Sequence, residues 1–143
     1  MSELVVVGVD GSANADAALE WALAYAKDRG ARVGVIFAWL YEVIGVPGAR
    51  FPVETRDKAE ARAEQVVDDA LARVGSDDVE VESITRLGAP QKVLLEAAAD
   101  ADLLVVGSRG HGGFAGLLLG SVSLQCVTHA PCPTVVVPLQ DEG

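Results

Sequence analysis

Aromatic residues are scarce in this chain of 143 residues: Phe, Trp and Tyr together make up 5%, although apolar residues of all kinds make up 50%. The core must therefore be aliphatic, and the high apolar content excludes an intrinsically disordered chain. A chain of this length buries roughly two-thirds of the surface that it exposes when unfolded. No linker or internal repeat divides the sequence, so we expect residues 1–143 to form a single domain.

Basic residues are also few. The 11 Lys and Arg residues stand against 21 Asp and Glu residues, which gives a formal net charge of −10. Such a chain does not attract a nucleic-acid backbone or an anionic membrane surface. The charge is unevenly distributed, however: residues 103–140 contain no Asp or Glu, and Arg109 is their only fully charged side chain. The composition thus excludes nucleic acid as a partner, but it leaves room for one small anion in this segment.

The chain has only two cysteines, Cys126 and Cys132, and their spacing is not that of a Cys-x-x-Cys redox or zinc pair. No His or Cys cluster has metal-ligand spacing, so we expect no metal site. Two free thiols, no basic signal-peptide start and no apolar run of membrane-spanning length predict a cytoplasmic protein. A disulfide or redox-sensing pair is the alternative for the cysteines.

Short apolar runs alternate with helical patterns along the whole sequence. The predicted strands cover residues 4–9, 33–39, 79–85, 103–106 and 134–137. The predicted helices follow near residues 12, 54, 90 and 121. Gly30 is expected to end the first helix, and Pro90 follows a turn and is expected in the first turn of the third, whose buried stripe includes Leu94. This alternation is typical of an α/β fold with a parallel sheet and helices on both faces. We expect a flavodoxin-like or Rossmann-like open sheet of five strands in the order 3-2-1-4-5.

Within these elements, several side chains have simple structural interpretations. Ser12 or Asn14 is expected to cap the first helix, in which Trp21 and Tyr25 share the spacing of the apolar face. Trp21 and Trp39 are both expected in the core or in a pocket wall. Residues 40–53 contain several Gly and Pro and are a candidate lid loop.

In open parallel sheets, ligands bind at the carboxyl ends of the strands, where the strand order reverses. If the first and fourth strands are neighbours, the turn Asp10-Gly11-Ser12 meets the glycine-rich segment 107–121 there. Glycines let backbone N–H groups approach a ligand, and a helix that begins at Ser121 presents free N–H groups to an anion. Asp10 is placed to accept hydrogen bonds from ribose hydroxyls. The alternatives are a glycine-rich turn with no ligand and an Asp10 that only caps the helix.

Three blocks of this sequence resemble the universal stress protein family. The spacing Gly107-x2-Gly110-x9-Gly120-Ser121 resembles the family's nucleotide-binding signature. Residues 5–12, Val-Val-Val-Gly-Val-Asp-Gly-Ser, resemble its first strand and turn, and residues 130–137 resemble its ending. The resemblance extends from residue 4 to residue 138.

The resemblance to the ATP-binding branch of this family implies ATP as ligand, with Mg²⁺ as its companion. The turn Asp10-Gly11-Ser12 would hold the ribose. The phosphate-binding residues implied by the motif are Gly107, Arg109, Gly110, Gly120, Ser121, Val122 and Ser123. The adenine would lie against the strand end formed by Phe37, Ala38 and Trp39 and would be bordered by Gly88.

The last strand raises the question of oligomeric state. In the order 3-2-1-4-5 it is an edge, yet its sequence, Thr134 to Val137, is that of a buried strand. An exposed apolar edge favours pairing with another chain, so we expect a homodimer through this strand, as the resemblance also implies. The alternative is that the C-terminal tail covers the edge.

We therefore expect a dimeric, ATP-binding stress or regulatory factor, with an unidentified protein partner as a further option. No convincing water-activating base is found: His111 is expected to be an exposed loop residue, and His129 to lie near a helix end. A weak ATPase or autophosphorylating enzyme, and a nucleotide-free dimeric scaffold, are the alternatives. A phospho-acceptor receiver domain and a flavodoxin share the fold class but match the strand ends poorly.

Overall fold

The structure is a computed structural model that describes residues 2–40, 55–76, 78–109 and 119–139. Its strands are β1 (Leu4–Gly8), β2 (Arg32–Trp39), β3 (Val81–Leu87), β4 (Leu103–Gly107) and β5 (Thr134–Val137). Its helices are α1 (Ala13–Arg29), α2 (Arg56–Val74), α3 (Pro90–Ala98) and α4 (Ser121–His129). The predicted loop at residues 40–53 lies outside the described residues, apart from the exposed Leu40.

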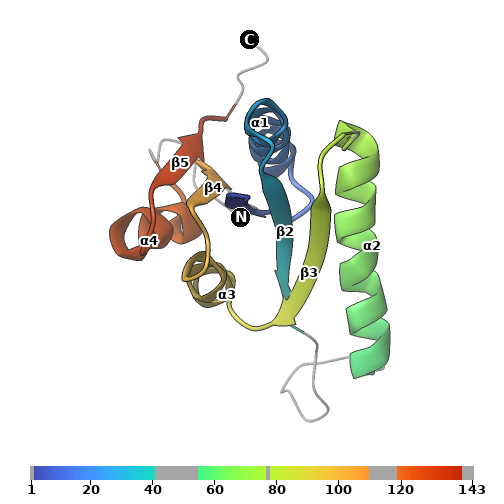
Figure 1. The fold of residues 1–143 in the computed structure, drawn as a ribbon. Coiled ribbons are helices and arrows are strands. Elements are labelled where there is room, and N and C mark those ends of the chain that lie inside the picture. The colour runs from blue at the N-terminus through green and yellow to red at the C-terminus, as the bar shows by residue number, and fades with distance from the viewer. Residues whose placement is uncertain (1, 41–54, 77, 110–118, 140–143) are drawn as a thin grey trace.

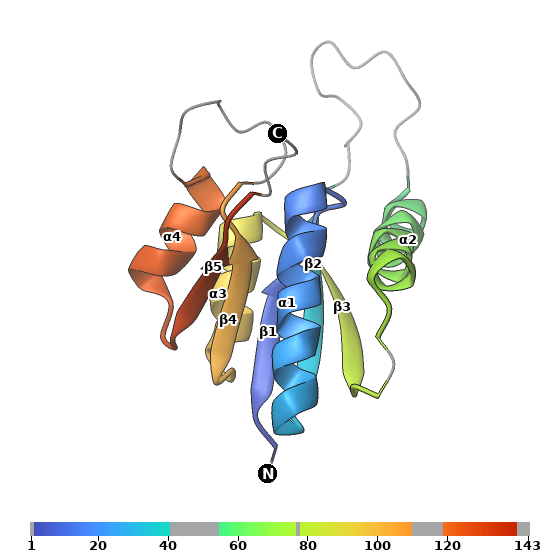
Figure 2. The same ribbon diagram turned by 90° about the horizontal axis from the view of Figure 1, so that it is seen from above.

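The five strands form one parallel sheet in the order β3-β2-β1-β4-β5, which confirms the predicted fold (Figure 1). Helices α1 and α2 pack on one face of this sheet, and α3 and α4 pack on the other. Figure 2 shows the same layers from above, with α1 in front of the sheet and α3 behind it. The strand order reverses between β1 and β4. This switch point is where the sequence analysis predicts that a ligand binds.

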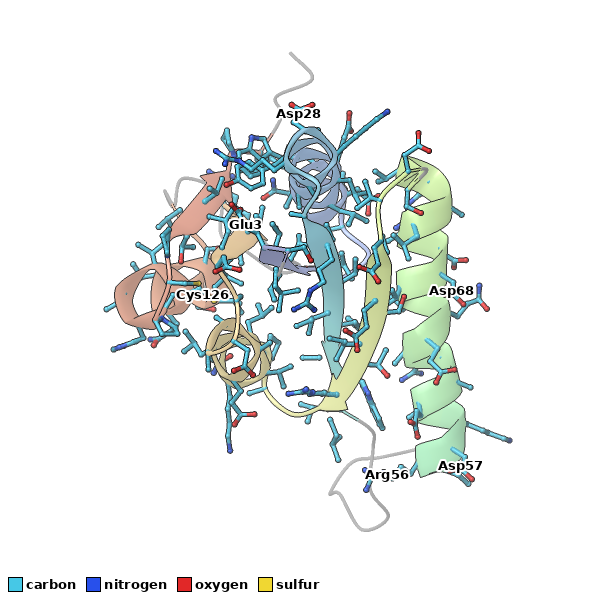
Figure 3. All side chains as sticks on the ribbon, in the orientation of Figure 1. Glu3, Asp28, Arg56, Asp57, Asp68 and Cys126 are labelled. Atoms are coloured by element: carbon cyan, nitrogen blue, oxygen red, sulfur yellow. The ribbon has the colours of Figure 1, made fainter. Side chains whose placement is uncertain are left out.

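Two aliphatic layers hold the sheet to its helices. Under α1 and α2, the buried side chains include Val7 and Val35 of the sheet and Leu19 of α1. Under α3 and α4, Leu104 of β4 and Cys126 of α4 are both fully buried. At about 25 cal/mol per Å² of apolar surface, such layers are the main favourable contribution to folding. Figure 3 shows that Asp28, Asp57 and Asp68, by contrast, lie on the outer surfaces of the helices.

The ends of α1 follow from local chemistry. Ser12 is the N-cap, and its hydroxyl accepts a hydrogen bond from the backbone N–H of Ala15 at 3.2 Å. Gly30 ends the helix in the left-handed conformation, with φ 67°, which costs a glycine little. The expected burial of Trp21 is wrong: this side chain is 38% exposed and stacks on Tyr25 at the helix surface. The buried stripe of α1 consists of Ala and Leu side chains, such as Ala18, Leu19 and Ala22, and does not include Trp21.

The two edges of the sheet differ in character. Strand β3 begins two residues later than predicted and carries exposed polar side chains such as Glu82 and Arg86, which discourage pairing with another chain. Strand β5 is short and carries mostly valine, and within a single chain Val137 is its one buried residue.

Among the described residues, no helix is long and apolar enough to cross a bilayer.

Candidate functional site

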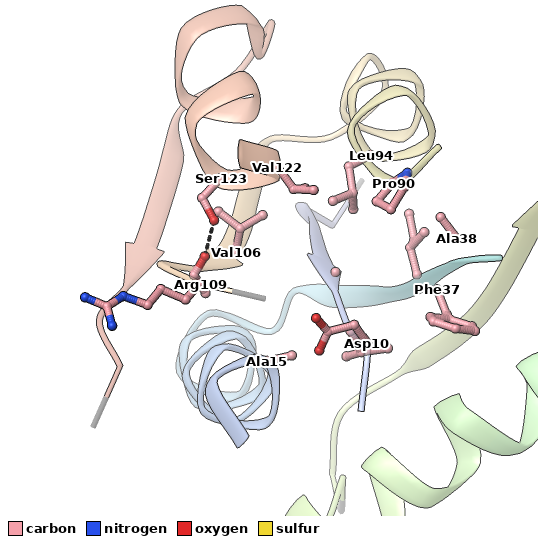
Figure 4. A pocket seen from close by; sticks show the side chains of 14 residues that line it. Asp10, Ala15, Phe37, Ala38, Pro90, Leu94, Val106, Arg109, Val122 and Ser123 are labelled. Carbon is pink, nitrogen blue, oxygen red and sulfur yellow. Dashed lines mark hydrogen bonds between the residues drawn. The ribbon is translucent and has the colours of Figure 1, made fainter. Parts of the chain in front are cut away.

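A cavity of about 370 Å³ opens at the carboxyl ends of β1, β2 and β4, between the beginnings of α3 and α4 (Figure 4). It lies at the switch point of the sheet. Its lining residues are Gly8, Val9, Asp10, Ala15, Ile36, Phe37, Ala38, Pro90, Leu94, Val106, Gly107, Arg109, Val122 and Ser123.

The lining divides into an apolar end and a polar end. The apolar end consists of Ile36, Phe37 and Ala38 from β2 together with Pro90 and Leu94 from α3. The polar end consists of Gly107, Arg109 and Ser123, at the end of β4 and in the first turn of α4. In Figure 4 the carboxylate of Asp10 lies between these two groups. Such a division suits a ligand with one flat apolar part and one anionic part.

Asp10 is held in place by the turn that follows β1. Its Oδ1 accepts a hydrogen bond from the backbone N–H of Ser12 at 2.9 Å. The alternative in which Asp10 caps α1 is wrong, because Ser12 takes that role. The half-buried Asp10 carboxylate lines the cavity from this turn.

The first turn of α4 is bound to the end of β4. The backbone N–H of Gly120 donates to the carbonyl of Ser108 at 2.7 Å. The Ser123 hydroxyl, 4% exposed, donates to the carbonyl of Gly107. The Ser123 hydrogen is therefore engaged within the protein, and the hydroxyl oxygen is the atom that remains open to a donor. The contact keeps the N-terminus of α4 beside the cavity.

The structure brings half of the predicted site residues to the cavity. Those that line it are Asp10, Phe37, Ala38, Gly107, Arg109, Val122 and Ser123. Those that are not among the lining residues are Gly11, Ser12, Trp39, Gly88, Gly120 and Ser121, of which Gly120 and Ser121 form the beginning of α4 beside the cavity. Gly110 and His111 lie outside the described residues.

The predicted residues that miss the cavity have structural positions of their own. Trp39 is buried against Ala59 and Ala63 of α2, which makes it a core residue. Side chains alternate between the two faces of a strand, so Trp39 and Ala38 point to opposite faces. Gly88 adopts φ 151°, and its N–H donates to the Trp39 carbonyl at 3.0 Å, which ties the end of β3 to that of β2.

Asn14 is a buried residue in the first turn of α1 and not the helix cap that was its predicted alternative role, since Ser12 is the cap. Sequence reasoning missed what Asn14 does instead. Its Oδ1 accepts a hydrogen bond from the Arg109 backbone N–H at 2.7 Å, and its Nδ2 donates to the Val137 carbonyl at 3.1 Å. One amide thus joins the ends of α1, β4 and β5. The available signal was a polar residue one position after the helix begins, on the side that faces the sheet.

The aliphatic wall of the cavity is not indicated by the sequence pattern. The pattern predicts Pro90 at a turn and Leu94 in a buried helix stripe, yet both line the cavity. Val106 lines it as well, because it points to the α3–α4 face of the sheet. Periodicity distinguishes buried from exposed side chains, but it does not distinguish a core contact from a cavity wall.

Neither cysteine belongs to the cavity lining, and both are free thiols. Burial of Cys126 between α4 and the sheet raises the pKa of its thiol from 9.0 to about 11. The thiolate is the nucleophilic form of cysteine, so Cys126 is unreactive near neutral pH. Among the described residues, no group of three or more His, Cys, Asp or Glu side chains is placed to hold a metal ion.

Comparison with known proteins identifies the family of this chain. Residues 1–138 match the model of the universal stress protein family. A universal stress protein of Thermus aquaticus is 35% identical over 141 residues, which cover 96% of this chain and 99% of that protein. One of Mycobacterium tuberculosis is 36% identical over 95% of this chain, which spans only 45% of that relative's length.

A solved structure extends the likeness to three dimensions. It is the crystal structure of a universal stress protein in complex with cAMP, with a TM-score of 0.68 and 28% sequence identity. The match covers 96% of this chain and 97% of the other. Together with the family match over residues 1–138, this likeness shows that the chain belongs to the universal stress protein family.

Proposed function

We propose that the cavity binds an adenine nucleotide, specifically ATP, and that the chain is a single universal stress protein domain acting as a dimeric, nucleotide-dependent regulatory factor in the cytoplasm. The observation that carries the proposal is the division of one cavity at the switch point into an apolar end, a carboxylate and a polar end. A relative of the same fold whose crystal structure holds cAMP supports the nucleotide class.

Each part of the cavity suits one part of a nucleotide. Phe37, Pro90 and Leu94 offer apolar surface to a base. The Asp10 carboxylate only accepts hydrogen bonds when ionised, and ribose hydroxyls donate them. The backbone beside Gly107, the Arg109 side chain and the N-terminus of α4 favour negative charge, as phosphates require.

Mg²⁺ fits this site only as a companion of the nucleotide. Mg²⁺ is commonly held by one or two carboxylates together with substrate phosphates and water. Asp10 is the only carboxylate among the described lining residues. It is thus the residue of the chain that would face the ion, and the phosphates would supply the remaining charge.

The described part of the chain offers no pair of side chains in the arrangement of a nucleophile and its base at this cavity. His129 is exposed at the end of α4 and is not among the residues that line the cavity. Binding therefore accounts for the site without a chemical step. Slow ATP hydrolysis and transfer of phosphate to Ser121 or Ser123 stay as the second candidate function.

The dimer is proposed through β5. The carbonyls of Pro133 and Val137 accept hydrogen bonds from β4. Because backbone groups alternate in direction along a strand, those of Thr134 and Val136 face away from β4. A second copy of β5 would pair with these groups and cover the valine side chains.

Isothermal titration calorimetry with ATP, AMP, cAMP and GTP tests the binding proposal. We expect ATP to bind, and Asp10→Ala to weaken ATP at least tenfold, because a charge-assisted hydrogen bond contributes about 1.5–3 kcal/mol. Asp28→Ala, at an exposed position of α1, is the matched control and should leave affinity unchanged. A wild-type protein, freed of copurified ligand, that binds no adenine nucleotide would overturn the proposal.

A further inference from the structure

The geometry points to Asn14 as the positioning residue of the polar end of the cavity: its side-chain amide holds the backbone of Gly107–Arg109 in the place where it meets phosphate. The inference rests on the proposed nucleotide function, which it deepens. Asn14 is 3% exposed and is not among the residues that line the cavity, so it acts through the backbone that it holds.

Both ends of the Asn14 amide are committed, which fixes its orientation. Only the oxygen can accept from the Arg109 N–H, at 2.7 Å, and only the nitrogen can donate to the Val137 carbonyl, at 3.1 Å. The Ser108 hydroxyl adds a longer contact to the same oxygen at 3.4 Å. The Arg109 backbone is thus held by a side chain from α1.

The packing of Gly107 supports the same conclusion. A Cβ atom added to Gly107 would lie 2.8 Å from both Cγ and Oδ1 of Asn14 and 3.1 Å from its backbone oxygen. The first turn of α1 therefore approaches β4 so closely that no side chain fits between them. At this position the glycine serves the contact with Asn14 as well as the approach of a ligand.

Ser108 extends this connection to the chain beyond β5. Its N–H donates to the Val137 carbonyl at 2.8 Å, and its hydroxyl accepts from the Leu139 N–H at 3.0 Å. Its carbonyl accepts from the Gly120 N–H, which precedes α4. Asn14 and Ser108 together determine where the cavity's polar backbone lies relative to α1, α4 and β5.

A positioning role predicts a selective loss of affinity. Asn14→Ala leaves the Arg109 N–H without the Asn14 acceptor and removes one of the two donors to the Val137 carbonyl, so the backbone near Gly107 shifts. Asp10 and the apolar end do not contact Asn14 in any described hydrogen bond and should be preserved. We expect ATP affinity to fall about tenfold, and adenosine, which has the same base and ribose but no phosphate, to bind within about twofold of wild type.

The experiment measures ATP and adenosine affinity by calorimetry for wild type, Asn14→Ala and the control Gln65→Ala, which removes an exposed amide from α2. Amide NMR reports the Arg109 N–H directly: loss of the hydrogen bond should shift its resonance upfield and speed its exchange with solvent. Thermal unfolding verifies that each variant is folded. If Asn14→Ala does not fold, Asn14→Ser, which is too short to reach Arg109, carries the same expectations.

The outcomes separate the two proposals. Selective weakening of ATP together with a changed Arg109 resonance supports the positioning role. Unchanged ATP affinity, equal losses for both ligands, or an unaltered Arg109 resonance would overturn it and leave nucleotide binding standing. A wild-type protein that binds neither ATP nor adenosine would overturn the proposed function and this inference together.

Discussion

Arg73 of α2 donates hydrogen bonds to both carboxylate oxygens of Asp16 in α1: Nε lies 2.7 Å from Oδ2, and Nη2 lies 3.1 Å from Oδ1. The hydrogen bond to Asp16 raises the pKa of Arg73 above its ordinary value. This pair joins the two helices on one face of the sheet, beside the helix turn that carries Asn14.

Loss of this pair should have a small, salt-dependent effect on stability. Arg73 is about half exposed, and exposed ion pairs contribute little because water and salt screen them. We expect Arg73→Gln to lower the Tm by about 2 °C or less in low salt, and by less in 1 M NaCl. Lys92→Gln, at an exposed position of α3, is the control. A fall that is unchanged in high salt would contradict an electrostatic origin.

Gly107→Ala should destabilise the fold and weaken ATP binding, because the new Cβ would overlap Asn14. Forcing an extra group into a packed site costs about 1–3 kcal/mol. Gly34→Ala in β2 is the matched control, since its Cβ would meet nothing closer than 3.7 Å, an ordinary contact. Chemical unfolding and calorimetry measure the two effects. Equal behaviour of the two variants would show that the Asn14 contact does not constrain Gly107.

Cys126 should make the protein less stable at alkaline pH. Its pKa is about 11 in the folded chain, because burial disfavours the thiolate, against an ordinary value of 9.0. Below pH 9 both states keep the proton. Between pH 9 and 11 the unfolded chain releases its proton while the folded chain keeps it, so stability falls, by about 1–3 kcal/mol in total.

The measurement is the free energy of unfolding of wild type and Cys126→Ala at several pH values from 7 to 11. The variant has a lower stability at pH 7, since it leaves a cavity, but it should lose less on going to pH 11. Cys132→Ala is the comparison: burial and the charge of Asp102 also raise the pKa of Cys132, but Cys132 is only partly buried, so this variant should change the pH dependence less. Parallel curves for wild type and Cys126→Ala would contradict the assignment.

Pairing of two β5 strands should depend on the outward N–H of Val136. Val136→Pro removes that donor without removing a β4 hydrogen bond, and proline is tolerated on edge strands. We expect wild type and Val136→Ala to be dimers and Val136→Pro to be a monomer by light scattering. A wild-type monomer at tens of micromolar would contradict the proposed interface.

Much of the fold could be predicted because the strands and helices differ in period. The valine runs at residues 4–9 and 103–106 indicated buried central strands, and Gly30 and Pro90 marked helix boundaries that the structure confirms. The exposure of Trp21 could not be predicted, because helical spacing places a residue on a face but does not show how wide the buried stripe is. Ala18 and Ala22 fill that stripe.

The site was predictable where a strand end fixed it. Asp10 and Gly107 lie at the carboxyl ends of the buried strands β1 and β4, and both line the cavity. The sequence predicts Asn14 only as a possible helix cap, because its actual partners Arg109 and Val137 are 95 and 123 residues away in the sequence. A contact at that separation depends on the tertiary structure, so the pattern of neighbouring residues in the sequence does not predict it.

The sequence separations between Asn14 and its partners determine when the polar end of the cavity can form during synthesis. Asn14 leaves the ribosome early, yet the carbonyl that its amide needs belongs to Val137. Parallel strands pair only after long loops close, so the polar end of the cavity forms when β5 docks beside β4. A nascent chain that stops before β5 would have the apolar end and Asp10 but not the anchored phosphate end, and ATP binding would therefore mark the completion of folding.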